Sequence, residues 1–344
     1  MAGRTMQIGI DSFATIIPGS GPVLSPADRV ANLLEEAEAA DRAGIDVFGI
    51  GEHHRAEFVE SAPTVLFGAI AARTRTIRLQ SAVTVLGADD PVRVFQDYAT
   101  IDLISGGRAE IVAGRGSAVE AYPLFGHRLE DRDALYDEKL RLLMMLREDS
   151  HPHWSGRFRA PLDGFGIFPR SVQAKLPLWV GVGGTPASFA RAGKLGLPLM
   201  VAIIGGAFAR FRPLVDLYRA EAATARIAEA ERIVGVHAVG FVGDTDTEAR
   251  DAFFPGWYDM WTTLGPERGW PTPSHAQFDA LCAPDGPYII GSPETVAAKL
   301  RFLSDALGGV ARVNLQMSSA SGDHAAMLQS AELLGQRVKP LLHA

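Results

Sequence analysis

Cysteine is almost absent from this chain of 344 residues, which contains only Cys282. A single thiol excludes an intramolecular disulfide framework and suits a reducing compartment. No apolar run approaches the roughly 20 residues of a membrane-spanning helix, and no signal-peptide pattern follows the first residues. Basic residues are not in excess either: the net charge of −7 argues against nucleic acid or an acidic membrane as the main partner. We therefore expect a cytoplasmic protein.

Familiar catalytic signatures are also missing. The chain has no G-x-S-x-G elbow, no H-E-x-x-H pair and no Walker sequence. Its glycine-rich turn at 181–186 is not a dinucleotide fingerprint, because Pro186 stands where the third glycine belongs. The function must therefore be sought in other residues.

Strand and helix patterns alternate along the whole chain, whose 47% apolar and 21% charged residues are typical of a globular protein. Eight strands, each followed by a helix, exceed the usual open sheet and predict an α/β fold, a (β/α)8 TIM barrel. The expected strands are Met6–Asp11, Asp46–Gly51, Ile77–Leu86, Ala109–Ala113, Leu178–Val182, Pro198–Ile204, Ile233–Val242 and Val310–Met317.

Two segments exceed ordinary connections and are interpreted as insertions in a single domain, 1–344. The first, at about 151–172, is rich in proline, glycine and aromatics and predicts a hairpin before the fifth strand. The second, at about 254–288, holds several aromatics among six prolines after the seventh strand. Long loops without regular structure are usually lids or disordered, and the aromatic content here favours a lid.

The run Glu52-His53-His54 follows the second strand, at the barrel end where active sites lie. Adjacent side chains of a strand point to opposite faces, so the two histidines should not share one target. We expect one to face the barrel mouth and the other to pack outward with a hydrogen-bond partner. Two structural histidines, or a metal-dependent hydrolase built on both with a carboxylate, are the alternatives.

Arg115, between Gly114 and Gly116, follows the fourth strand, and Gly183-Gly184-Thr185 precedes a helix that begins at Pro186. A guanidinium matches phosphate bidentately, and a helix N-terminus offers free amides. Together they predict a phosphate site, although each segment alone would also fit a surface salt bridge or a tight turn.

Small residues interrupt the third strand at Ser81-Ala82-Val83, where a planar ring or ordinary core packing would fit equally well. The helix at 62–73 is apolar nearly all round. Because an outer helix normally keeps a polar face, we expect a homodimer partner to cover it.

Taken together, these residues resemble the bacterial luciferase-like family of flavin-dependent monooxygenases. The likeness runs along nearly the whole chain, and the order and spacing of its pieces carry it. They are Asp46–His54, Ser81–Arg93, Asp102–Arg108, Gly114–Gly116, Val182–Pro186, Gly196–Pro198, Phe254–Trp261 and Gly291–Glu294.

The resemblance implies FMN at the carboxyl ends of the strands, with Arg115 and the amides of Gly183, Gly184 and Thr185 on its phosphate. It makes His53 the catalytic acid or base. It also implies a non-proline cis peptide at Ala82-Val83 beneath the flavin, beside Ser81 and Gly114. Ile203 takes the place of a luciferase tryptophan, and Gly183-Gly184 that of Glu-Ser, so light emission is not expected.

We therefore predict a monooxygenase that uses reduced FMN, supplied by a flavin reductase, and dioxygen to oxidise a small organic substrate. Two rivals share the barrel: a deazaflavin-dependent hydride-transfer oxidoreductase and a non-catalytic flavin-binding protein. The sequence does not identify the substrate or show whether NAD(P)H reduces the flavin directly.

Overall fold

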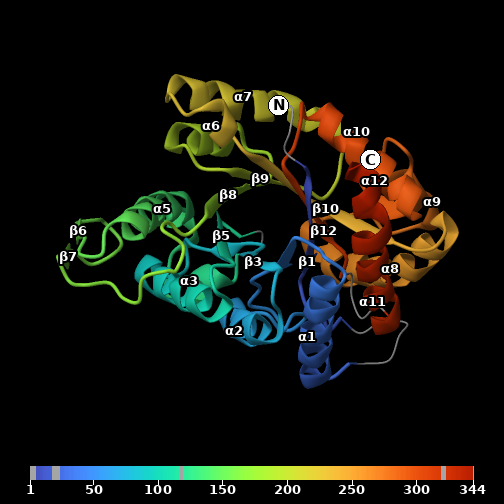
Figure 1. Ribbon diagram of the computed structural model, residues 1–344, viewed down its shortest axis with the longest axis horizontal. Coiled ribbons are helices and arrows are strands. Elements are labelled where there is room, and N and C mark those ends of the chain that lie inside the picture. Colours follow the sequence, from blue (N-terminus) through green and yellow to red (C-terminus); the bar gives the residue numbers. More distant parts are fainter. Residues whose placement is uncertain (1–4, 18–23, 117–118, 319–322, 344) are drawn as a thin grey trace.

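Eight parallel strands close into a barrel in this computed structural model, which describes residues 5–17, 24–116, 119–318 and 323–343 (Figure 1). The ring order is β1, β2, β3, β5, β8, β9, β10 and β12, and β12 pairs with β1 to close it. The predicted TIM barrel is confirmed. Its strands are β1 (Gln7–Ser12), β2 (Val47–Ile50), β3 (Arg78–Ser81), β5 (Ala109–Gly114), β8 (Leu178–Val182), β9 (Leu199–Ile203), β10 (Val234–Val242) and β12 (Arg312–Gln316).

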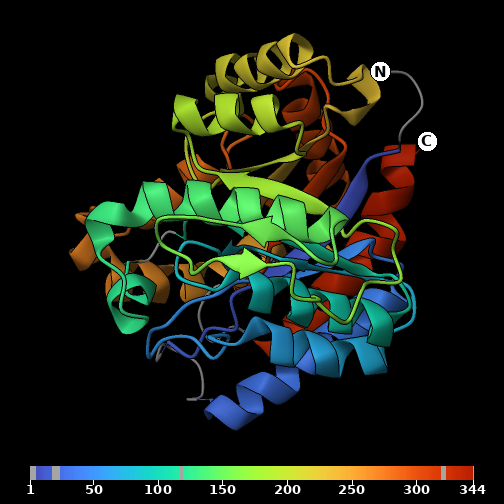
Figure 2. The same ribbon diagram turned by 90° about the vertical axis from the view of Figure 1, so that its left-hand side faces the viewer.

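Helices surround the barrel and cover the outer face of its strands, as Figures 1 and 2 show. They are α1 (Pro26–Arg42), α2 (Pro63–Arg73), α3 (Pro91–Ser105), α4 (Ala121–Leu124), α5 (Arg132–Glu148), α6 (Pro186–Leu195), α7 (Arg212–Thr224), α8 (Asp246–Arg268), α10 (Pro293–Ala306), α11 (His324–Leu333) and α12 (Lys339–His343). Of these, α1, α2, α3, α6 and α10 begin at proline, whose missing amide hydrogen costs nothing in the first turn.

The first insertion forms the predicted hairpin, in which β6 (His153–Trp154) pairs antiparallel with β7 (Leu162–Asp163). The second is not the irregular loop that its prolines suggested. Helix α8 continues through Pro255 and Pro266 to Arg268, and α9 (His275–Cys282) follows. Aromatic packing explains the difference, because Trp257 lies buried between Trp261 and Phe278 and hydrogen-bonds to Tyr288.

Two short strands extend the predicted set. β4 (Thr84–Val85) continues the line of β3 along β5, so the predicted strand 77–86 is broken at residues 82–83. β11 (Ile289–Gly291) pairs with the end of β10, directly after the segment expected to be a loop.

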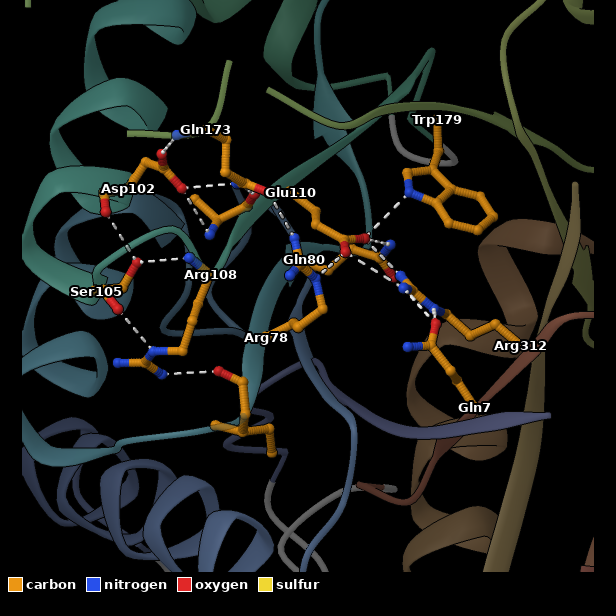
Figure 3. Close-up of polar contacts among 12 residues, drawn as sticks. Gln7, Arg78, Gln80, Asp102, Ser105, Arg108, Glu110, Gln173, Trp179 and Arg312 are labelled. Carbon is orange, nitrogen blue, oxygen red and sulfur yellow. Dashed lines mark hydrogen bonds and ion pairs between the residues drawn. The ribbon is translucent and has the colours of Figure 1, made fainter. Parts of the chain in front are cut away.

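The barrel interior at the amino ends of the strands is polar rather than apolar. Glu110 lies at its centre and accepts hydrogen bonds from Arg312 at 2.5 Å, from Trp179 at 3.1 Å, and from Arg78 (Figure 3). Burial raises the pKa of Glu110, but the two arginines outweigh burial and lower the pKa overall. We call Glu110, Arg78, Arg312 and Trp179 the floor cluster.

Candidate active site

A cavity of about 580 Å³ opens at the carboxyl ends of the barrel strands. That volume lies within the range of small-molecule sites, and this end of a TIM barrel is where active sites lie. Most of the predicted site residues line it: His53, Ser81, Ala82, Val83, Gly114, Arg115, Gly183, Gly184 and Thr185.

Ile203 is the exception among the predicted residues. Its side chain is fully buried in the apolar core outside the barrel, whereas its neighbours Ala202 and Ile204 line the cavity. Side chains alternate along a strand, so a displacement of one residue moves a side chain to the opposite face. On β9 the side chains that line the cavity are therefore those of Ala202 and Ile204 rather than that of Ile203.

At one end of the cavity, Arg115 lies beside the start of α6. Arg115 approaches Ser188 in the first turn of α6 at 3.3 Å and pairs with the exposed Asp133 at 2.6 Å, which lowers the pKa of Asp133. Helix α6 has no side-chain cap, and the amides of Gly184 and Thr185 just before it donate to no other group among the described residues. A Cβ at Gly183 or Gly184 would meet nothing within 4 Å. Cation, amides and empty space thus converge.

The peptide bond between Ala82 and Val83 is cis, as predicted from the family resemblance. The Val83 side chain fills space that two glycines leave free. A Cβ at Gly114 would lie 2.4 Å from one of its methyl groups, and a Cβ at Gly181 would lie 2.8 Å from the other. These two glycines therefore shape the cavity wall through Val83.

The two adjacent histidines separate as expected. His53 lines the cavity, stacks on Phe58, and its Nδ1 lies 2.6 Å from Oε1 of Glu60. His54 points elsewhere and bonds to Glu52 at 3.1 Å, which raises its pKa. Burial raises the pKa of Glu60, more than His53 lowers it. Because Glu60 contacts Nδ1 of His53, Nε2 of the same ring stays available to a molecule in the cavity.

Sequence reasoning missed a second histidine–carboxylate pair. His237 on β10 lines the cavity, and its Nδ1 lies 2.6 Å from Oδ2 of the buried Asp11 on β1. Phe13 lies between the two histidines, 5.6 Å from the His237 ring and 4.9 Å from the His53 ring. The available signal was a lone histidine at an inward position of an otherwise apolar strand.

Helix α8 covers part of the mouth. Met260, Leu264 and Arg268 line the cavity from this helix, so the predicted aromatic lid segment does reach the site, as a helix. Arg55 holds it in place: its guanidinium bonds to Glu267 of α8 and to Glu120 of the opposite loop, each at 2.7 Å.

The sequence profile of one family, described as luciferase-like monooxygenase, matches residues 10–308. The chain belongs to this family. Among relatives, the 4-hydroxyprotoasukamycin monooxygenase of Streptomyces nodosus subsp. asukaensis is 27% identical over 330 residues, covering 89% of this chain and 85% of that protein. An uncharacterized protein of Sinorhizobium fredii is 35% identical over 119 residues, 34% of this chain. The chain thus matches only part of the length of two uncharacterized proteins from that organism, 35% of one and 54% of the other.

Solved structures of similar fold cover nearly the whole chain. A monooxygenase from Streptomyces bottropensis superposes with a TM-score of 0.84 at 22% identity, covering 97% of this chain and 99% of the other. The oxygenating constituent of 3,6-diketocamphane monooxygenase from Pseudomonas putida, in complex with FMN, gives 0.78 at 20% identity with 98% of each covered. A secondary alcohol dehydrogenase dependent on coenzyme F420 gives 0.75 at 18%, covering 98% and 99%. At these identities the likeness establishes the fold.

Two further properties concern only the described residues. None of their helices combines the length and apolar character needed to cross a bilayer. Nor do three histidine, cysteine, aspartate or glutamate side chains gather there in a way that could hold a metal ion, so the hydrolase alternative has no ligand set in that part of the chain.

Proposed function

We propose that this protein is an FMN-dependent monooxygenase that uses reduced flavin and dioxygen to oxidise a small organic substrate. The observation that carries the proposal is the convergence of Arg115 with the uncapped start of α6, at one end of a cavity whose wall contains the Ala82-Val83 peptide. An anion held there places an attached ring system along the cavity. The named monooxygenase relative and the FMN-bound fold neighbour support this assignment.

The residues present fit FMN. Its phosphate would replace Asp133 as the ion-pair partner of Arg115. It would also accept hydrogen bonds from the amides of Gly184 and Thr185, next to the open space at Gly183. Its ring would lie against Ala82 and Val83. When bound, reduced flavin supplies electrons and activates dioxygen, chemistry that belongs to the cofactor.

The protein itself would manage protons and exclude water. Nε2 of His53 faces the cavity with Nδ1 fixed by Glu60, so it is placed to give or take a proton beside the flavin ring. Apolar side chains of α8, Met260 and Leu264, cover the cavity from above. Their cover would limit the access of bulk water to the reacting groups.

The deciding experiment is FMN binding followed by flavin fluorescence. We expect micromolar binding by the wild type and a loss of tenfold or more in Arg115→Ala, about 1.4 kcal/mol or more for a charged hydrogen bond. Arg191→Ala is the matched control, because Arg191 of α6 pairs with Asp137 at 2.7 Å and does not line the cavity.

No FMN binding by the wild type would contradict the proposal and direct the same titration to the deazaflavin coenzyme. Tight FMN binding without oxygen consumption, whether NAD(P)H or a flavin reductase supplies the electrons, would indicate a non-catalytic flavin carrier. Consumption that requires the reductase would support it as a partner.

We also propose that the protein forms a homodimer through α2. This helix leaves Val65 72% exposed beside the exposed Ala62, Ala69 and Ala72, an apolar face open to a second copy. Sedimentation velocity should show a dimer that Val65→Asp dissociates. Phe165→Asp, at a 69% exposed position just beyond the β6–β7 pair, should leave the dimer intact; a wild-type monomer would contradict the proposal.

A further inference from the structure

A continuous line of hydrogen bonds runs from the floor cluster to the cavity. Nε2 of Gln80 donates to Oε2 of Glu110 at 3.0 Å, and Figure 3 shows both side chains. Oε1 of Gln80 accepts from Nδ2 of Asn314 at 2.9 Å, and the same Nδ2 donates to Oδ1 of Asp11 at 3.0 Å. Oδ2 of Asp11 lies 2.6 Å from Nδ1 of His237. Each of these residues is at least 93% buried.

This line has a fixed direction. Arg312 and Arg78 keep Glu110 ionised, so Glu110 can only accept, and Gln80 must turn its amide nitrogen toward it. The carbonyl of Gln80 then requires a donor, which is the amide nitrogen of Asn314. The second hydrogen of that nitrogen goes to Oδ1 of Asp11, so this oxygen is an acceptor.

The direction determines the tautomer of His237. An ionised Asp11 accepts from Nδ1–H of His237, which leaves Nε2 of the neutral ring with a lone pair. No described residue hydrogen-bonds to Nε2, and the side chain lines the cavity. The ring therefore presents a proton acceptor to whatever occupies this side of the cavity.

The position of His237 assigns it to the substrate, an argument that rests on the proposed flavin site. Strand β10 lies four places from β3 in either direction around the eight-stranded ring, so it faces β3 across the barrel. A flavin against Ala82-Val83 on the β3 side leaves the space beside His237 for a second molecule.

We propose that Nε2 of His237 binds an acidic hydroxyl of the substrate, a phenol or an enol, and removes its proton. The O–H bond breaks, its electron pair stays on the substrate oxygen, and the proton forms a new bond to Nε2. The resulting imidazolium is stabilised by the Asp11 carboxylate through Nδ1–H. The substrate anion is electron-rich and therefore more readily oxygenated.

The first test is the tautomer itself, read from nitrogen-15 spectra of histidine-labelled protein. The wild type should show neutral His237 protonated at Nδ1, its signals assigned by their loss in His237→Gln. In Asp11→Asn the new amide can accept from Asn314 and donate to Nδ1, so the proton should move to Nε2. A wild-type ring protonated at Nε2 would overturn the proposal.

The second test compares 4-nitrophenol with its methyl ether, 4-nitroanisole, which has no hydroxyl proton. The wild type should bind the phenol at least tenfold more tightly than the ether and take it up as the coloured phenolate. His237→Gln keeps a polar group near Nε2 but accepts no proton, so the phenolate colour should be lost. Asp11→Asn should abolish the preference for the phenol.

The matched control is His153→Gln on the exposed hairpin, which should keep the full preference. Equal affinities for phenol and ether in the wild type, or binding of neither, would overturn the proposal. FMN affinity is measured on the same samples, so a failed flavin site would appear separately from a failed hydroxyl preference.

Discussion

Two buried glutamates, one in the floor cluster and one beside the mouth of the barrel, sit in opposite surroundings. Glu110 in the floor cluster is held by two arginines, a tryptophan and an amide, and its pKa is lowered despite burial. Glu60 near the mouth contacts His53, its Oε2 has no hydrogen-bond partner among the described residues, and burial raises its pKa. The floor thus satisfies its charge completely, whereas the mouth holds a buried carboxyl group with one unpaired oxygen and a raised pKa.

The difference separates stability from chemistry within one barrel. A fully paired buried charge fixes the arrangement of the strands and offers nothing to a ligand. An incompletely paired one costs stability and retains a proton that can be exchanged, which is typical of functional sites. Substitutions at the floor should therefore change unfolding more than binding, and substitutions at the mouth should do the reverse.

The largest effect is expected for Glu110→Gln. Removing this carboxylate leaves the buried Arg312 and the half-buried Arg78 without a counter-charge, so the free energy of unfolding should fall by about 3–5 kcal/mol. Urea denaturation measures it. Glu148→Gln is the control, because its ion pair with Lys175 is solvent-exposed and should matter by less than about 1 kcal/mol. Equal losses in both variants would contradict the role given to the floor cluster.

The pH dependence of that loss has a definite sign. A lowered pKa in the folded state means that ionised Glu110 stabilises the protein above pH 4.5, and that this stabilisation is lost as pH falls through the folded pKa. The difference in the free energy of unfolding between the wild type and Glu110→Gln should therefore become smaller in acid. Urea denaturation of both proteins at pH 7 and pH 4 measures this difference.

Gly114→Ala should have the next largest effect. Its Cβ would lie 2.4 Å from the Val83 side chain, so the wall must shift, at a cost of about 1–3 kcal/mol. Thermal unfolding measures the loss, and flavin binding should weaken too because Val83 lines the cavity. An unchanged melting temperature would show that Val83 relaxes freely.

Gly183→Ala is the counterpart on the open side of the mouth. Nothing lies within 4 Å of the new Cβ, so the unfolding free energy should stay within about 0.5 kcal/mol of wild type. The methyl group would still enter the proposed phosphate site and should weaken FMN binding severalfold. A lower free energy of unfolding with unchanged FMN binding would contradict the assignment of this turn to the phosphate site.

The smallest effect is expected for Glu60→Gln. Because the folded pKa of Glu60 is raised, wild-type stability is lost as pH rises from 4.5 through that pKa. Glutamine does not ionise, so the variant should gain on the wild type over the same range. Denaturation at pH 4.5 and pH 8 measures this change in the free energy of unfolding. If the wild type instead becomes more stable relative to the variant over this range, His53 carries the charge of the pair.

The sequence predicted those features that depend on local pattern. Strand ends placed His53 and Arg115 at the mouth, and glycines marked the open turn at 183–184. The family resemblance added the cis bond at Ala82-Val83, which no residue pattern would have indicated.

Features that depend on the three-dimensional arrangement were not predictable in this way. Ile203 was misplaced because inward and outward positions look alike in a strand that is apolar on both faces. Glu60 and Asp11 lie 7 and 226 residues from their histidines, so only folding reveals these pairs. Helix α8 overrode its internal prolines through tertiary packing of Trp257, which sequence propensity does not include.

The pairing of the first and last barrel strands has a consequence for synthesis. One edge of β1 stays unpaired until β12 has left the ribosome, about 15–60 s later for the intervening residues at 5–20 residues per second. An exposed strand edge can pair with other chains and promote aggregation. Production of this protein should therefore depend on translation speed and chaperone supply, because its barrel cannot close until β12 has been synthesised.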